Sequence, residues 1–162
     1  MPAMNATNSP TDPFDLARFV QAQAHSYIQA IAEIRGGRKR SHWMWYVLPQ
    51  IDGLGFSAMS QRYSIKSIAE AKAYLSHPVL GKRLVECCEA ALGIEGRTAR
   101  EIFGSPDDMK LRSCGTLFEV VAPDSVFSRL IEKCYGGERD GATLRLLDAA
   151  RRAPLADSPC AT

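Results

Sequence analysis

Residues 42–57, HWMWYVLPQIDGLGFS, combine side chains that bind flat ligands with one that transfers protons near neutral pH. They include an imidazole, two indoles and an amide, namely His42, Trp43, Trp45 and Gln50. Indole rings stack on flat groups and donate an N–H, and an imidazole gains or loses a proton close to pH 7. Because Pro49 and two glycines interrupt helical geometry, we expect exposed backbone N–H and C=O groups beside the rings. The segment is therefore either part of the core or the lining of a ligand site.

A cationic run, RGGRKR at residues 35–40, precedes this segment. Arg38 and Lys39 are placed to bind a phosphate or a carboxylate. Alternatively, the run complements the C-terminal dipole of the preceding helix and is otherwise solvated. On the first interpretation, the predicted ligand-binding residues are Arg38, Lys39, Trp43, Trp45 and Gln50.

Catalysis at this site would need acid–base groups near the aromatic rings. His42 and Lys110 are the acid–base or electrostatic candidates, and the candidate carboxylates are Asp107, Asp108 and Asp140. The predicted catalytic set is therefore His42, Lys110 and Asp140. Serine, threonine and cysteine residues lack the local partners that mark a nucleophile.

The sequence predicts neither a metal nor a cofactor. His25, His42 and His77 stand in no metal-ligand spacing, and His77 before Pro78 is typical of a hydrogen-bond donor at a helix end. Five cysteines, an odd number without disulfide-scaffold spacing, indicate reduced thiols. GLGFSA at residues 53–58 fits a dinucleotide fingerprint in letters only, because the chain offers no parallel sheet around it.

Helix signals recur along most of the chain. Asp12 and Pro13 begin a helix that we expect to run to Gly36, and Ser67 and Thr98 open further helices with capping-box spacing. Further N-termini are predicted at residues 105–108, 124 and 140. We predict an all-α, compact, non-repetitive bundle of about six or seven helices with one irregular aromatic segment near residues 36–63.

The length and composition of the chain are typical of a single domain. We expect a single helical domain over residues 12–152, with disordered tails at 1–11 and 153–162. A net charge of +2 over 162 residues makes nucleic acid an unlikely partner unless a local cluster supplies the field. Without a signal peptide or a long apolar run, we expect a cytoplasmic protein with no membrane contact.

Several stretches, including SHWMWYVLPQIDGLGFSAMSQRYSI, EAKAYLSHPVLGKRL and IFGSPDDMKLRSCGTLF, resemble the family catalogued as domain of unknown function 1810, sometimes labelled calpastatin. A further stretch, GGERDGATLRLL, extends the likeness to about residues 14–148. The resemblance implies a small, mainly α-helical bacterial protein and brings no established activity with it. The calpastatin label does not imply protease inhibition.

The order of these parts is also similar to that in NADAR proteins, named for NAD and ADP-ribose, whose helical domains process glycosidic links of ribose derivatives. That likeness implies a ribose-bearing ligand. The sequence departs from the pattern at positions 41 and 42, which hold Ser41 and His42 where those enzymes carry an acid beside the aromatic stretch.

Two functions follow from these observations. The first is binding, with processing as an extension, of a small anionic nucleotide- or ADP-ribose-like ligand in a cavity of at least ~300 Å3 lined by cations and aromatic rings. The second is a non-catalytic protein-interaction module that exposes the aromatic segment as a flat patch. The oligomeric state is left open by the sequence.

Overall fold

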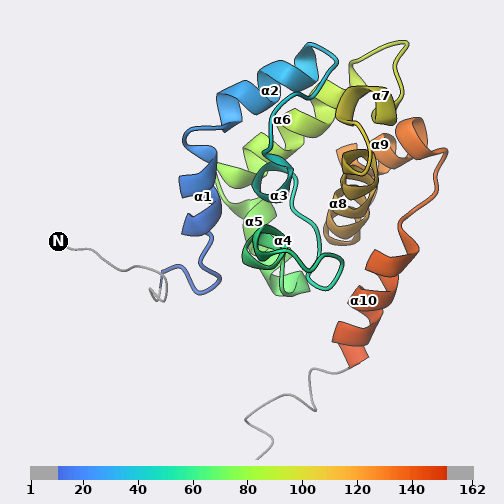
Figure 1. Ribbon diagram of the computed structural model, residues 1–162. Coiled ribbons are helices and arrows are strands. Elements are labelled where there is room, and N and C mark those ends of the chain that lie inside the picture. The colour runs from blue at the N-terminus through green and yellow to red at the C-terminus, as the bar shows by residue number, and fades with distance from the viewer. Residues whose placement is uncertain (1–10, 153–162) are drawn as a thin grey trace, which may run out of the picture.

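The computed structural model describes residues 11–152, which form ten helices (Figure 1). In chain order the helices are α1 (Ala17–Gln23), α2 (Tyr27–Arg35), α3 (Met44–Val47), α4 (Ala58–Tyr63), α5 (Ile68–Ser76), α6 (Leu80–Leu92), α7 (Ala99–Phe103), α8 (Asp107–Val121), α9 (Val126–Tyr135) and α10 (Gly141–Arg152). The described residues contain no strand, and an isolated parallel bridge joins Ile51 to Ile65. The predicted all-α class is confirmed. The predicted tails lie outside the described residues, except for Thr11.

The helix count is higher than the predicted six or seven, because some expected helices divide and short ones form in the irregular segment. The single helix expected from Asp12 to Gly36 is wrong: the chain turns at residues 24–26 and separates α1 from α2. The Asp12 carboxylate nevertheless caps the start, accepting from the backbone N–H groups of Leu16 (2.7 Å) and Ala17 (3.0 Å). Ile28, which falls on the apolar face of a single continuous helix through this region, is 78% exposed after this turn.

Most predicted caps form as expected. Ser67 accepts from the Glu70 amide at 3.0 Å, and Thr98 and Glu101 form a reciprocal capping box. The expected cap at Asp124 is wrong, since Ser125 caps α9 and Asp124 adopts a positive φ of 55° just before it.

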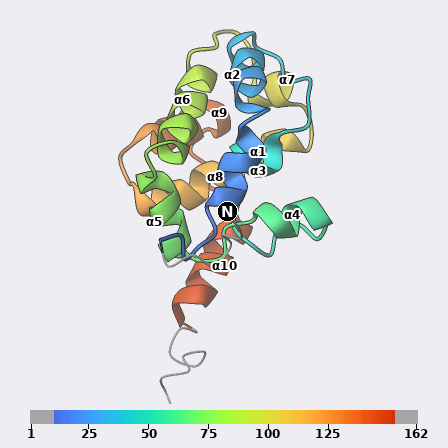
Figure 2. The ribbon, with the colours of Figure 1, turned by 90° about the vertical axis from the view of Figure 1, so that its left-hand side faces the viewer.

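α8 lies at the centre of the bundle and contacts α5, α7, α9 and α10 (Figures 1 and 2). A run of aromatic rings crosses the core from α1 to α9, through Phe19, Tyr74, Phe118 and Phe127. Neighbouring ring centroids along this run are 5.0, 5.5 and 5.7 Å apart, which is the range of favourable tilted and edge contacts. None of the helices in residues 11–152 is long and apolar enough to cross a membrane.

The irregular segment after α2 carries two short helices at the surface. α3 packs against α1 and against α4, while α4 has no buried residue of its own. Figure 2 shows α4 projecting from one side of the bundle. The loop between these helices turns at Gly53, where φ is 106° and the backbone lies against Leu146 of α10. This segment positions the candidate site.

Candidate functional site

The two tryptophans of the aromatic segment have different surroundings. Trp43 is 1% exposed, its ring meets Phe103 edge-on with centroids 6.4 Å apart, and its indole N–H donates to a Glu33 Oε1 2.8 Å away. Trp45 is only partly buried and lines a pocket. The segment therefore contributes one tryptophan to the core and one to the pocket lining.

Glu33 on α2 organises the start of this segment, a role that was not predicted from the sequence. Its carboxylate accepts from the backbone N–H groups of Arg40 and Ser41, from the Ser41 hydroxyl at 2.6 Å and from the Trp43 indole. Desolvation by burial, the largest single effect, raises the Glu33 pKa, but the hydrogen bonds together outweigh it and lower the pKa to about 2. Glu33 is therefore an ionised acceptor that fixes the chain between α2 and α3.

Residues 38–40 run in a non-helical stretch that directs neighbouring side chains to different environments. The Lys39 side chain is 7% exposed, and its ammonium lies 2.8 Å from an Asp107 oxygen and 5.0 Å from the Trp43 ring centroid. It also donates to the Ser41 carbonyl at 2.5 Å. Arg38 is exposed and its side chain has no polar partner within residues 11–152. Lys39 is thus already neutralised, whereas Arg38 is not.

Asp107 at the start of α8 links the buried cation to a second, more accessible one. The Lys110 ammonium lies 3.6 Å from the other Asp107 oxygen, and the Lys110 side chain is 27% exposed. The same ammonium lies 5.4 Å from the centroid of the Trp45 ring, within the range of a cation–π contact. The structure therefore brings together four predicted site residues, Lys39, Trp43, Trp45 and Lys110, around Asp107.

A pocket between α3, α4 and α8 contains three of the predicted residues. It is lined by Met44, Trp45, Leu48, Gln50, Ser60, Tyr63, Ser64 and Lys110. The Gln50 amide side chain makes no hydrogen bond within the described residues. The free volume is about 10 Å3, enough for a single water molecule, and the expected cavity of ~300 Å3 is not formed here. Of the residues expected on a flat aromatic patch, Trp43 and Met44 are buried, whereas Phe56 in the same segment is 82% exposed.

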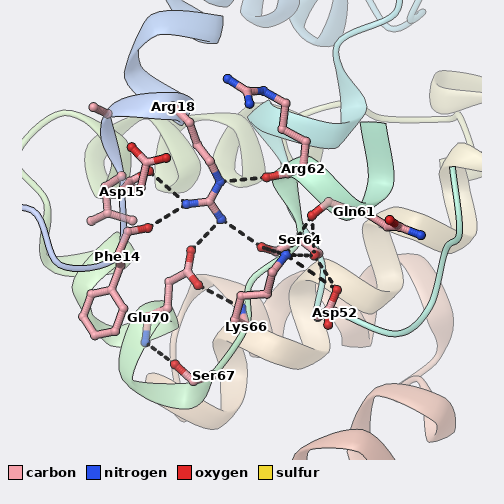
Figure 3. Close-up of polar contacts among 12 residues, drawn as sticks. Phe14, Asp15, Arg18, Asp52, Gln61, Arg62, Ser64, Lys66, Ser67 and Glu70 are labelled. Carbon is pink, nitrogen blue, oxygen red and sulfur yellow. Dashed lines mark hydrogen bonds and ion pairs between the residues drawn. The ribbon is translucent and has the colours of Figure 1, made fainter. Parts of the chain in front are cut away.

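A buried arginine fixes the C-terminal end of α4, where Tyr63 and Ser64 line the pocket (Figure 3). The guanidinium of Arg18, on α1, is 8% exposed and donates through all five N–H groups. The acceptors are four backbone carbonyls and one carboxylate, from Phe14, Asp15, Arg62, Ser64 and Glu70. Glu70, 2% exposed, also accepts from the Lys66 amide at 2.9 Å. The C-terminal end of α4 is thereby joined to α1 and α5.

Comparison with known proteins adds the family. Residues 13–147 match the family described as "Protein of unknown function (DUF1810)". The chain belongs to the DUF1810 family. It is similar to the conserved hypothetical protein Rv1873 from Mycobacterium tuberculosis, with 51% sequence identity and a TM-score of 0.83 over 85% of this chain and 99% of that one. No match was found among curated proteins.

The resemblance to domain of unknown function 1810 is therefore confirmed, and the comparisons give no support to the likeness to NADAR proteins. The DUF1810 description states no activity. A function for this chain therefore has to be inferred from its own geometry.

The predicted catalytic set of His42, Lys110 and Asp140 shows no mutual contact in this DUF1810 chain. His42 is exposed, and its imidazole has no partner among the described residues. The Asp140 carboxylate caps α10, accepting from the Thr143 amide at 3.0 Å and from the Ser113 hydroxyl at 3.2 Å. Only Lys110 of the three lines the pocket. Two of the three are thus placed away from this pocket.

Other titratable groups in the DUF1810 fold have structural surroundings. The His77 Nδ1 accepts from the amides of Val79 and Leu80 at 3.1 and 3.2 Å, so this helix-end residue acts as an acceptor and not as the predicted donor. Burial raises the pKa of the Cys88 and Cys114 thiols well above their ordinary value. Within residues 11–152, no group of three or more ligating side chains is arranged to hold a metal ion.

Proposed function

We propose that the pocket between α3, α4 and α8 binds a small anionic ligand that carries a flat ring, of which a nucleotide is the model case. The observation that carries the proposal is the partly exposed Lys110 ammonium 5.4 Å from the Trp45 ring, both of them lining one apolar pocket. An indole face stacks on a flat group, and an ammonium beside it attracts the ligand's negative charge. A few polar groups in an apolar lining are typical of small-molecule sites.

The remaining lining supports this assignment. Met44 and Leu48 supply apolar surface, and the unpaired Gln50 amide offers both a donor and an acceptor to a ring edge. Lys39 is not the ligand's cation, because Asp107 already neutralises it at 2.8 Å. Lys110 is 3.6 Å from Asp107 and more exposed, so it retains more of its charge for an incoming anion.

A ring enters this pocket only if α4 moves outward, because the present free volume holds one water molecule. α4 buries none of its residues, and its side of the pocket comes from Ser60, Tyr63 and Ser64. Displacing the exposed start of α4 therefore exposes little apolar surface. The Arg18 contacts to the carbonyls of Arg62 and Ser64 hold the other end in place. α4 is accordingly a flap attached at its C-terminal end.

The geometry supports binding more than processing, because neither His42 nor Asp140 lines the pocket. The interaction-module alternative would require an exposed aromatic surface. Burial of Trp43 and Met44, 1% and 2% exposed, leaves Phe56, at 82%, as the highly exposed large aromatic ring of the segment, and a single ring is a small surface for a protein partner.

The test is a thermal-shift screen with AMP, ADP, NAD and ADP-ribose, followed by calorimetric titration of any compound that stabilises the protein. A ligand at 100 times its Kd stabilises by about 2.7 kcal/mol, which corresponds to a rise in Tm of roughly 5–10 °C for a chain of this size. Lys110→Gln and Trp45→Leu should each weaken binding about tenfold or more. Lys82→Gln, which removes an exposed cation on α6, is the matched control and should bind normally.

Two results would contradict the proposal. One is that no compound of this class raises the Tm of the folded protein. The other is that a compound binds, but Trp45→Leu and Lys110→Gln bind it as well as Lys82→Gln does.

A further inference from the structure

Four arginines form an exposed basic surface at the end of the molecule where α2 ends and α7 begins. They are Arg38, Arg40, Arg97 and Arg100, and none of them lines the pocket discussed above. We refer to this set as the arginine surface. The arginine surface includes Arg38 and Arg40 of the cationic run RGGRKR, neither of which lines the pocket.

Two segments distant in sequence are joined to make this surface. The Lys39 amide donates to the Ile102 carbonyl at 2.6 Å, which ties residues 38–40 to α7. Gly37 adopts a φ of 81° and lies so close to Arg97 that a Cβ there would be 3.3 Å from the Arg97 Cδ. Figures 1 and 2 both show the end of α2 beside α7. Net charge sums over the whole sequence, so it could not predict that residues 38–40 and the start of α7 lie side by side.

The non-helical backbone of residues 38–40 presents two arginines on either side of an inward lysine. Lys39 is directed inward, with a side chain 7% exposed, whereas Arg38 and Arg40 are exposed. Two exposed guanidinium groups so close in sequence can each bind a different phosphate of a repeated phosphate backbone.

The charges of this surface are not neutralised within the described residues. None of the four arginines takes part in an ion pair there. Of the acids nearby, Glu95 pairs with Lys133, whereas Glu33 and Glu101 accept from neutral N–H groups and keep their charge, so they offset the four arginines only in part. Like charges left together repel, and an anion removes that repulsion.

We propose that the arginine surface binds the phosphate backbone of nucleic acid without sequence preference. Arginine binds phosphate oxygens through two parallel N–H groups. The large aromatic side chain nearest in sequence, Trp43, is buried, and the exposed ring near Arg40 in sequence is the small imidazole of His42, so stacking on bases contributes little beside the phosphate contacts. Contacts limited to phosphates position a protein on nucleic acid but read no sequence. This function is separate from ligand binding in the pocket.

Fluorescence anisotropy with a labelled mixed-sequence DNA duplex tests the proposal. Four phosphate contacts predict that log K falls with log salt with a slope of about −3.6, and with a slope of about −2.8 for a single strand. Replacing all four arginines, Arg38→Gln, Arg40→Gln, Arg97→Gln and Arg100→Gln, should weaken binding at least tenfold and flatten the slope. Changing the duplex sequence should leave the affinity within about twofold.

A matched control removes the same charge elsewhere. Lys72→Gln, Lys82→Gln, Arg129→Gln and Arg145→Gln together take four exposed cations from α5, α6, α9 and α10. This control should keep DNA affinity within a few fold of the parent protein. If the fourfold arginine variant unfolds, as circular dichroism would show, the single variants Arg38→Gln and Arg97→Gln replace it, each with a loss of about threefold.

Three outcomes would overturn the proposal. The first is no binding to duplex or single-stranded DNA or RNA at about 50 mM salt. The second is an equal loss in the control variant, which would mean that only net charge matters. The third is binding to phosphatidylglycerol vesicles but not to nucleic acid, which would assign the surface to a membrane.

Discussion

Trp43→Ala and Trp45→Ala should differ in their effect on stability, because one indole is in the core and the other lines the pocket. Trp43 is 1% exposed and is covered by Phe103 and by the Lys39 ammonium. Removing a buried indole leaves a cavity, at a cost of about 3–5 kcal/mol. The lost hydrogen bond to Glu33 adds about 1 kcal/mol, and no more, because Glu33 keeps its other donors.

Trp45→Ala removes a partly exposed ring that already borders open space. Its cost should be about 1–2 kcal/mol, because little of the ring is enclosed by other atoms. A total of about 4–6 kcal/mol for Trp43→Ala corresponds to a fall in Tm of roughly 8–24 °C. The fall for Trp45→Ala should be less than half of that.

Urea unfolding followed by far-UV circular dichroism measures both changes, because this signal does not depend on which tryptophan remains. Unchanged m-values would show that the compared states are the same. Equal losses for the two variants would refute the separation of core from pocket. Trp43→Phe is a useful control, since it keeps an aromatic ring and should recover much of the loss.

Three further measurements test other parts of the structure. The Glu33 pKa is lowered from 4.5 to about 2, so the stabilisation by Glu33 is complete above about pH 4.5 and is lost as pH falls towards 2. At neutral pH the unfolding free energies of the parent and of Glu33→Gln should differ by about 1–2 kcal/mol, after allowance for partial exposure. The two free energies should converge near pH 2. Arg18→Met should cost about 3–5 kcal/mol because it leaves the Glu70 carboxylate buried without its cation, and a double variant with Glu70→Met that regained no stability would argue against this explanation. The Cys88 and Cys114 thiols, whose pKa burial raises, should react with Ellman's reagent in urea but not in the native state, and rapid native labelling would contradict their burial.

The capping residues were predictable because they act over a few residues. Asp12, Ser67, Thr98 and Asp140 each bond to amides three to five positions along the chain, so their pattern is visible in the sequence alone. The break between α1 and α2 was not predictable in this way. Gln23, the last residue of α1, is held instead by a partner distant in sequence, because its buried amide donates to the Tyr46 carbonyl at 2.7 Å.

Glu33 was missed for a related reason. It is eight to ten positions before its partners Ser41 and Trp43, and nothing in a helical acid's local sequence distinguishes it from a solvated one. Only the turn at Gly36 and Gly37 brings it back onto the following segment. An acid in the last two turns of a helix, followed by a glycine turn and a tryptophan, is the signal that could have suggested it.

The aromatic segment also explains why one tryptophan could not be chosen over the other from the sequence. Trp43 and Trp45 are two positions apart, so they share a side in a strand but point about 200° apart in a helix. Pro49 and the glycines indicated an irregular backbone and left both arrangements open. The single turn of α3, Met44–Val47, decides the matter by turning Trp45 away from the core. Trp43 then lies against Lys39, and Trp45 lies against Lys110. Because Asp107 pairs with both lysines, the charge that Lys110 presents to the pocket depends on the ion pair between Asp107 and the buried Lys39.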